Sequence, residues 1–430
     1  MNLFSGGGFI PPDTTLAAGA SYIIEAVNAL ATVYNMTGVS QTILNTTACT
    51  TNVNTDSVSD PRVLFDSSSG IWFISSTTFS PITDASWNLL FSTTSDPTTT
   101  SWFCLIIPTS GIQNPDGTVG NFPDFPKIGI NANKVVLTGN AFSPTAGGDK
   151  FQGTEFVVIN KTKLLSGMAI ASLFPPDQGD FAIEPAQQLT KTSSTDALYM
   201  AAVNSSLAST STIDVWTIRG VPGDTTNPLQ TPQVTPLNIA TISQPPNAQQ
   251  KDPGNTGILI DTNDDSLLDA SFRDGPPGSL WVSANDACTP SGDTATRSCL
   301  RFINVSIDAG GAMSVTQDFD YADLGTYYYY PAIRTDAAGD LFAAFSGSSS
   351  SSFASAYAGA QSAGNINVLT NLSVTRAGDA SYTISPTRWG DYSGAGVDPS
   401  DLSVWLGAEY GTAIPILGSF WGTEITEAKP

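Results

Sequence analysis

Short apolar or alternating segments dominate the chain, and helical periodicity is almost absent. Segments such as SYIIEAVN at 21–28, GIWFISST at 70–77 and NKVVLTGNAF at 133–142 are separated by clusters of Gly, Asn, Asp, Ser and Pro. Alternation with a period of two residues, interrupted at short intervals by turn residues, is typical of β-strands. The pattern therefore predicts an all-β protein.

These segments group into a coarse repeat of about 50–60 residues. Each unit begins near a proline or an acidic residue, continues into an inner strand, turns, and enters a second hydrophobic strand. The units open at 11–19, 60–73, 122–137, 181–189, 267–282, 327–342 and 389–406.

A repeat of this length in an all-β sequence predicts a β-propeller. We expect a single domain over residues 1–430, with about seven blades of four antiparallel strands. Residues 1–10 would form an extended tail or a strand that closes the ring. Two β-sandwiches are the alternative, but the recurrence of the opening motif along the whole chain favours the propeller.

Composition excludes several classes of protein. The 430 residues include 16 Lys and Arg against 38 Asp and Glu, a net charge of −22, and no histidine. So few cations cannot form the basic surface of a nucleic-acid binder, and an anionic membrane would repel the chain. The absence of histidine excludes Ser-His-Asp catalysis and histidine-based metal sites. No apolar run reaches about 18 residues, so we expect no membrane span.

The four cysteines indicate two disulfides. Cys288 and Cys299 bracket a polar loop between apolar segments, as in a cross-linked hairpin, which leaves Cys49 and Cys104 to pair across neighbouring strands. Free buried thiols are the alternative. Two disulfides would imply an extracellular or cell-surface protein, and we expect any secretory signal to have been removed. Six N-x-S/T sequons are possible glycosylation sites: Asn35, Asn45, Asn160, Asn204, Asn304 and Asn371.

The opening segments resemble a known group of proteins. Five segments are similar to secreted bacterial and archaeal propellers near the sialidase-like superfamily, most of which have no assigned activity. They are PPDTTLAAGASYIIEAVNALATVYNMTG, DPRVLFDSSSGIWFISS, FPDFPKIGINANKVVLTGNAF, LWVSANDACTPSGDTATRSCLRF and RWGDYSGAGVDP with VWLGAEY. The resemblance spans nearly the whole chain and implies the propeller fold. The repeated Asp boxes of true sialidases are reduced here to STTSDPTTTSW at 92–102, and their R-I-P opener is missing.

In a propeller, the blade openers converge on one end of the central channel. Arg62, Lys127, Arg334 and Arg388, with Trp389, are candidate ligand-binding residues, because arginine forks hold anionic or polyhydroxylated ligands. Charge pairing among the inner strands is the alternative. The full converging set is Asp13, Asp60, Arg62, Asp124, Lys127, Glu184, Arg273, Tyr330, Arg334, Arg388, Asp391 and Tyr392.

The same set contains candidate catalytic residues for glycoside hydrolysis. This reaction needs an acid together with a nucleophile or base, and tyrosine replaces the nucleophilic carboxylate in sialidases. The candidates are Asp60, Asp124, Asp391, Tyr330 and Tyr392.

A possible calcium site lies at DTNDDSLLD. Asp261, Asn263, Asp265 and Asp269 supply oxygen ligands of the kind that Ca²⁺ accepts, although the Gly and Glu of an EF-hand loop are absent. A solvated turn rich in Asp and Asn is the alternative. We expect no other cofactor.

Together these patterns predict a secreted or cell-surface propeller that binds a glycan or another extracellular ligand on one face. A sialidase-like glycoside hydrolase is the first alternative, and a self-associating structural or filament subunit is the second. Only 13% of the residues are charged, so few groups would change charge on acidification, which suits an acidic habitat.

Overall fold

The computed structural model describes residues 1, 8–28, 30–46, 49–50, 57–78, 85–143, 149–177, 179–188, 196–203, 209–384, 387–414 and 418–429. Nearly all regular structure in these residues is β-strand, as the alternating pattern predicts. The one helix among them is α1 (Lys161–Leu165), which the side chain of Asn160 caps by accepting a hydrogen bond from the backbone N–H of Lys163.

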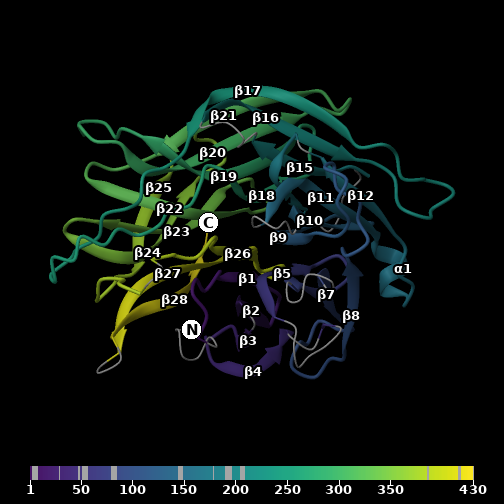
Figure 1. Cartoon of the computed structure of the whole chain (residues 1–430), viewed down its shortest axis with the longest axis horizontal. Coiled ribbons are helices and arrows are strands. Elements are labelled where there is room, and N and C mark those ends of the chain that lie inside the picture. Colours follow the sequence, from purple (N-terminus) through teal and green to yellow (C-terminus); the bar gives the residue numbers. More distant parts are fainter. Residues whose placement is uncertain are drawn as a thin grey trace.

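Most strands form antiparallel sheets in which each strand pairs with the next along the chain (Figure 1). The first sheet contains β1 (Thr15–Ala18), β2 (Tyr22–Val27), β3 (Leu30–Asn35) and β4 (Ser40–Asn45). The second contains β5 (Val58–Asp66), β6 (Ile71–Thr78), β7 (Ser86–Ser92) and β8 (Trp102–Pro108). Another contains β13 (Phe181–Pro185), β15 (Leu198–Val203), β16 (Ser209–Ile218) and β17 (Gln233–Ser243).

The C-terminal part of the chain adds two more sheets of this kind. One contains β22 (Thr326–Thr335), β23 (Leu341–Ser349), β24 (Ser352–Gln361) and β25 (Thr370–Arg376). The other has three strands, β26 (Gly394–Val397), β27 (Val404–Ile414) and β28 (Gly418–Ala428).

The remaining sheet has nine strands, and it changes the expected blade count. Its strands are β9 (Phe122–Ile130), β10 (Lys134–Ser143), β11 (Lys150–Asn160), β12 (Ala171–Asp177), β14 (Gln187–Gln188), β18 (Leu267–Arg273), β19 (Gly278–Cys288), β20 (Arg297–Ile307) and β21 (Met313–Tyr321). The short β14 pairs in parallel with both β9 and β18 and so joins two antiparallel meanders. In the described part of the chain, five separate sheets therefore form individual blades. This number is lower than the predicted number of about seven blades.

The hydrophobic core lies mainly between neighbouring sheets. Trp72 and Val63 of the second sheet pack with Ile24 of the first, and comparable clusters fill the spaces between later sheets. At the end of the chain, Trp405 of β27 packs against Leu16 and Ile23 of the first sheet. The sheets thus close into a ring around a common axis, which is the β-propeller arrangement predicted from the sequence.

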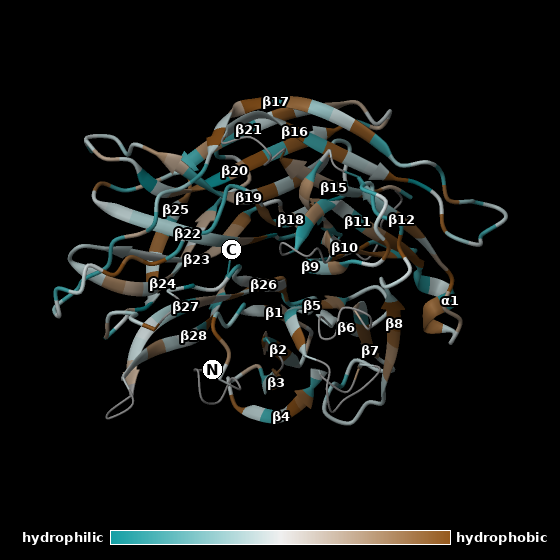
Figure 2. Ribbon diagram, viewed as in Figure 1, coloured by the Kyte–Doolittle hydropathy of each residue, from teal (hydrophilic) through white to brown (hydrophobic). Residues whose placement is uncertain are grey.

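Hydropathy follows this arrangement. Figure 2 shows hydrophobic segments concentrated in the strands, whereas the outer strand β17 alternates between hydrophobic and polar residues. The alternation agrees with the burial of β17, whose side chains are mostly exposed or half-buried. Outer strands face solvent on one side, and inner strands are covered on both sides.

A repeated bulge shapes the start of the inner strands. Asp60, Phe125, Ala182 and Tyr330 have positive φ angles of 54°, 51°, 51° and 59°, and the pairing register of their strands shifts at each position. A proline follows three of these residues, where the bulge leaves a ladder N–H unused. Two of these bulge residues, Asp60 and Phe125, also line a pocket at the strand starts.

Asparagines on neighbouring strands hold several bulges in place. Asn140 Oδ1 accepts from the N–H of Ala182 at 2.8 Å, and Asn285 Oδ1 accepts from the N–H of Tyr330 at 2.6 Å. Asn28 Oδ1 accepts from the N–H of Asp60 at 3.2 Å. Each bond links a residue in, or directly after, the second strand of one meander to the inner strand of the next, so it connects adjacent meanders.

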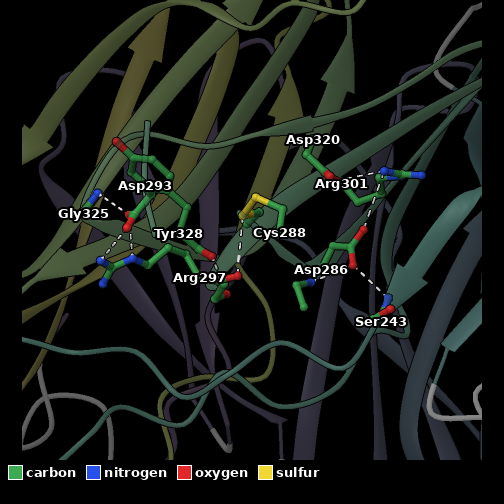
Figure 3. Close-up of a disulfide and its surroundings, with 12 residues drawn as sticks. Ser243, Asp286, Cys288, Asp293, Arg297, Arg301, Asp320, Gly325 and Tyr328 are labelled. Atoms are coloured by element: carbon green, nitrogen blue, oxygen red, sulfur yellow. Dashed lines mark hydrogen bonds and ion pairs between the residues drawn. A yellow bond between two sulfur atoms is a disulfide. The ribbon is translucent and has the colours of Figure 1, made fainter. Parts of the chain in front are cut away.

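Both predicted disulfides are present. Cys49 pairs with Cys104 and Cys288 with Cys299. Figure 3 shows the second disulfide among ion pairs of the same sheet, where Arg301 meets Asp286 and Asp320, and Arg297 meets Asp293. Within the described ranges, no helix has the length and apolar character needed to cross a bilayer.

Candidate functional site

A pocket of about 440 Å³ opens at the end of the axis where the inner strands begin. We call it the mouth pocket. Its polar lining includes Asp13 just before β1, Asp60 in β5, Asp124 in β9 and Asp391 just before β26. The rest of the lining is Phe9, Ile10, Pro11, Asn28, Val58, Ser59, Phe122, Phe125, Asn140, Phe181, Asn263, Asp264 and Arg388.

Arg388 is the one cation in this lining. Its Nη2 atom donates to Asp391 Oδ2, and its side chain remains 47% exposed. The N–H of Asp391 in turn donates to Asp13 Oδ1 at 3.0 Å. The carboxylates of the mouth pocket therefore outnumber the cations, and one guanidinium cannot neutralise all of them.

Burial and crowding shift the titration of these carboxyl groups. Burial, reinforced by the charge of Asp60, raises the pKa of Asp13 to about 7. Burial, reinforced by neighbouring carboxylates, also raises the pKa of Asp60 and that of Asp391 to about 7. Burial raises the pKa of Asp124 as well. Near neutral pH the cluster thus holds protonated and ionised carboxyl groups together.

The other three candidate cations lie deeper along the axis. Lys127 Nζ is 2.9 Å from Glu184 Oε2 and donates to the carbonyl oxygens of Ala182 and Leu267. Arg334 Nη1 is 2.6 Å from Asp269 Oδ2. These side chains are almost completely buried, so the charge pairing that the sequence left open as an alternative accounts for both of them.

Arg62 is held differently. Its guanidinium carbon lies 3.5 Å from the centre of the Tyr392 ring and 5.6 Å from that of Phe125. The Tyr392 hydroxyl donates to the carbonyl oxygen of Pro61 at 2.8 Å. Arg62 thus packs between aromatic rings below the mouth pocket, where a cation–π interaction stabilises its charge.

The remaining aromatic candidates belong to a buried cluster around the mouth pocket. Trp389 is 1% exposed, and its Nε1 donates to Ser346 Oγ at 3.1 Å. The hydroxyl of Tyr330 donates to the carbonyl oxygen of Asp261 at 3.2 Å. Both side chains belong to a buried cluster that also contains Phe125 of the pocket, and neither is part of the pocket lining.

The four residues of the expected calcium turn are spread out. Asp269 is engaged by Arg334, whereas Asn263 lines the mouth pocket. Asp261 Oδ1 accepts from the N–H of Asn263, and burial raises the pKa of Asp265 to about 6. Among the described residues no group of three or more Asp, Glu, Cys or His side chains is arranged to hold a metal ion. Calcium binding on this turn stays a prediction.

The sequons differ in their surroundings. Asn304 is 7% exposed and its side-chain amide donates to Ser279 Oγ, and Asn160 caps α1. Asn35 Oδ1 accepts from Thr37 and Val39 in an exposed turn. Asn45 and Asn371 lie on the outer strands β4 and β25, and Asn204 is outside the described residues.

Sequence reasoning missed several residues of the mouth pocket. Asn28 follows β2 and Asn140 lies within β10 beside a bulge, and nothing in the sequence separates either of them from an ordinary asparagine. Asp264 also lines the pocket, although it is not among the residues predicted from the sequence. Conversely, Arg273, which was expected at this end of the axis, lies at the far end of β18.

No family model matches the chain, and no curated protein matches it. Among solved structures it is similar to an ulvan lyase, with 10% identity, a TM-score of 0.40, and coverage of 87% of this chain and 93% of that chain. An exo-β-1,3-galactanase from Clostridium thermocellum gives 8% identity, a TM-score of 0.38, and coverage of 84% and 79%.

A sialidase from Trypanosoma rangeli is also similar, with 10% identity and a TM-score of 0.34. The match covers 90% of this chain but only 56% of the sialidase. The structural neighbours thus include a sialidase. At these identities they do not define the chemistry of this chain.

Proposed function

We propose that the protein binds a neutral glycan in the mouth pocket. The observation that carries the proposal is the lining itself: several carboxylates, three asparagine amides and the phenylalanine rings surround a cavity of about 440 Å³. Pockets of about 300–1,000 Å³ suit small ligands. Carboxylates and amides accept hydrogen bonds from sugar hydroxyls, and aromatic rings pack against the apolar faces of sugar rings.

The charge of the pocket argues for a neutral ligand over an anionic one. Only Arg388 offers a positive charge in the lining, against Asp13, Asp60, Asp124, Asp264 and Asp391. Lys127 and Arg334, which were expected to hold an anion, already have carboxylate partners. An anionic sugar would meet like charges and lose affinity.

Glycoside hydrolysis is the second candidate. The pKa of about 7 at Asp13, Asp60 and Asp391 favours it, because this mechanism needs one protonated and one ionised carboxyl group close together. The aromatic candidates Tyr330 and Tyr392 both donate their hydroxyls to backbone carbonyls. A carboxylate pair is therefore the more plausible catalytic unit.

The two disulfides support an extracellular or cell-surface location. The nine-stranded sheet also supports a finer description of the fold, since β9–β12 and β18–β21 each form a four-stranded antiparallel meander. If each of these two meanders forms one blade, the ring has the seven blades that the sequence predicts. A self-associating filament subunit stays a prediction, because most of the proposed N-terminal tail lies outside the described residues.

A glycan array run beside a panel of chromogenic glycosides tests the proposal. We expect the wild-type protein to bind neutral glycans, and Asp60→Asn to weaken binding by about tenfold or more. The substitution should not lower the melting temperature, because burial already favours the neutral carboxyl. Glu427→Gln, which removes an exposed carboxylate on β28, is the matched control.

The outcomes separate the two candidates. Binding without turnover supports a binding module and removes the hydrolase. Turnover that Asp60→Asn abolishes, with Glu427→Gln unaffected, supports the hydrolase. Failure of the wild-type protein to bind any neutral glycan overturns the proposal.

A further inference from the structure

A second cavity, of about 390 Å³, lies at the opposite end of β18 from the mouth pocket. Asn263 and Asp264, just before β18, line the mouth pocket, whereas Arg273 at the last position of β18 lines this second cavity. We call it the rear pocket. Its main side chains come from two neighbouring meanders: Arg273, Trp281, Asn304, Thr316, Gln317 and Gln361.

The charge of the rear pocket is opposite to that of the mouth pocket. None of the residues that line it is Asp or Glu, although the chain contains 38 acidic residues. Arg273 is its only charged lining residue. A cavity with one guanidinium and no carboxylate selects for an anionic ligand.

Arg273 is also poorly satisfied by the protein. Its Nε atom is buried and has no hydrogen-bond partner, and no ion pair joins its guanidinium to a carboxylate in the described part of the chain. The cations that do form such pairs are Lys127, Lys134, Lys150, Lys161, Arg297, Arg301, Arg334, Arg388 and Lys429.

The hairpin between β22 and β23 fixes the position of this guanidinium. A Cβ atom added to Gly339 would lie 3.1–3.3 Å from Arg273 Nη2, Cζ and Nε, so the glycine lets the guanidinium pack directly against the backbone. Gly339 also has a φ of +94°, which glycine adopts without strain. The guanidinium is thus held in place, and ordering it on ligand binding costs little.

Neutral polar groups complete the lining. Gln317 Oε1 accepts from Gln361 Nε2 at 3.0 Å and from the N–H of Asn367 at 2.8 Å. These two bonds orient the side-chain amide of Gln317. The Nε2 atom of Gln317 has no hydrogen-bond partner among the described residues. Ser279, Ser306 and Thr316 belong to the same lining. Ser279 Oγ accepts from Asn304 Nδ2 and Thr316 Oγ1 donates to Asn304 Oδ1, so these hydroxyls are held in place. Such groups suit a ligand that carries hydroxyls as well as one negative charge.

We propose that the rear pocket is a second binding site, specific for an acidic sugar of the hexuronate class. The carboxylate of the sugar would pair with the Arg273 fork, and its hydroxyls would bond to Gln317 and the serine and threonine hydroxyls. The cavity volume of about 390 Å³ accommodates one or two sugar rings. The proposal is independent of the neutral glycan proposed for the mouth pocket.

Calorimetric titration of the full chain with glucuronate tests the proposal, with glucose and acetate as comparison ligands at equal ionic strength. We expect glucuronate to bind at least about tenfold more tightly than either glucose or acetate. Arg273→Gln should weaken glucuronate binding by about tenfold or more, and Arg273→Lys should weaken it less, because lysine keeps the charge and loses the fork.

Arg219→Gln is the matched control. Arg219 lines an adjacent cavity that shares Gly275, Pro276 and Gly278 with the rear pocket but also contains Asp274 and Asp308. This variant should bind glucuronate as the wild-type protein does. Absent binding of glucuronate, equal binding of acetate, or equal losses in Arg219→Gln and Arg273→Gln would each overturn the proposal. If Arg273→Gln does not fold, Arg273→Lys and the ligand comparison still decide it.

Discussion

At the scale of single residues, the rare cations of this chain stabilise buried carboxylates. Lys127 is 1% exposed and pairs with Glu184, and Lys161 pairs with Asp66 at 2.8 Å. Burial lowers the pKa of Lys127 and raises that of Glu184. Their mutual attraction therefore has to offset the free-energy cost of removing two charges from water. Removing one partner of such a pair leaves the other charged and buried.

Lys127→Met should therefore destabilise the protein by about 3–5 kcal/mol. Adding Glu184→Gln to the same chain should recover part of the loss, because the unpaired carboxylate is then gone. Urea denaturation of both variants measures the effect. Lys150→Met, at the exposed ion pair with Asp116, is the control and should change stability little. A Lys127→Met loss no larger than that of the control would contradict the argument.

At the scale of elements, strand starts and cross-links organise the ring. Bulges recur near the starts of inner strands at Asp60, Phe125, Ala182 and Tyr330, and asparagines from preceding meanders hold three of them. The disulfides act away from the axis. Cys49–Cys104 closes a long segment, with a sequence separation of 55, and Cys288–Cys299 closes a hairpin with a separation of 11.

The two disulfides should differ in their effect on stability. A longer loop loses more freedom in the unfolded chain when it is closed, so replacing Cys49 and Cys104 by Ser should cost about 4 kcal/mol, and replacing Cys288 and Cys299 about 3 kcal/mol. Denaturant titration of the two double variants measures the difference. A larger loss for the hairpin disulfide would mean that native-state contacts, such as those in Figure 3, outweigh loop closure.

At the scale of the whole molecule, buried carboxyl groups set the response to pH. Burial raises the pKa of Glu155 to about 8 and, together with Asp320, that of Asp286 to about 7, in addition to the groups of the mouth pocket. Their unfolded pKa values lie near 4, so between pH 8 and 4 the folded state binds more protons than the unfolded state. Stability should therefore rise as the pH falls through this range.

The opposite group of carboxylates limits stability at lower pH. Burial tends to raise the pKa of Asp66, but Lys161 outweighs it and the net pKa is lowered. Burial also tends to raise the pKa of Asp196. Hydrogen bonds from Gly220 and Asn133 to its carboxylate outweigh that effect and lower the pKa to about 2. The contribution of such groups is present above their unfolded pKa and is lost as the pH falls toward their folded pKa.

Thermal melts from pH 2 to 8 should therefore show a maximum near pH 4. The melting temperature of the Glu155→Gln variant should rise less between pH 8 and 4 than that of the wild-type protein, because one of the groups that take up a proton is missing. Glu427→Gln, at an exposed site, should follow the wild-type curve. A steep fall in melting temperature between pH 6 and 4 would contradict the prediction and remove the argument for an acidic habitat.

The sequence by itself determined the local structure of this protein. Alternating apolar residues and frequent turn residues act over a few positions, so they predicted the strands, the all-β class and the closed propeller. The bracketing of a polar loop by Cys288 and Cys299 likewise predicted both disulfide pairings. The convergence of Asp60, Asp124, Arg388 and Asp391 followed from the repeat, because equivalent positions meet at the same end of the axis.

Only the tertiary structure decided which groups meet there and how they are used. Lys127 pairs with Glu184, and Arg334 pairs with Asp269. The members of each pair are more than 50 residues apart in the chain, and no local pattern specifies such partners. The parallel pairing of β14 with β9 and β18 likewise depends on how two meanders pack, and it altered the blade count. Burial and charge around each side chain are properties of this packing, so they separated an acidic mouth pocket from a rear pocket that contains Arg273 and no acid.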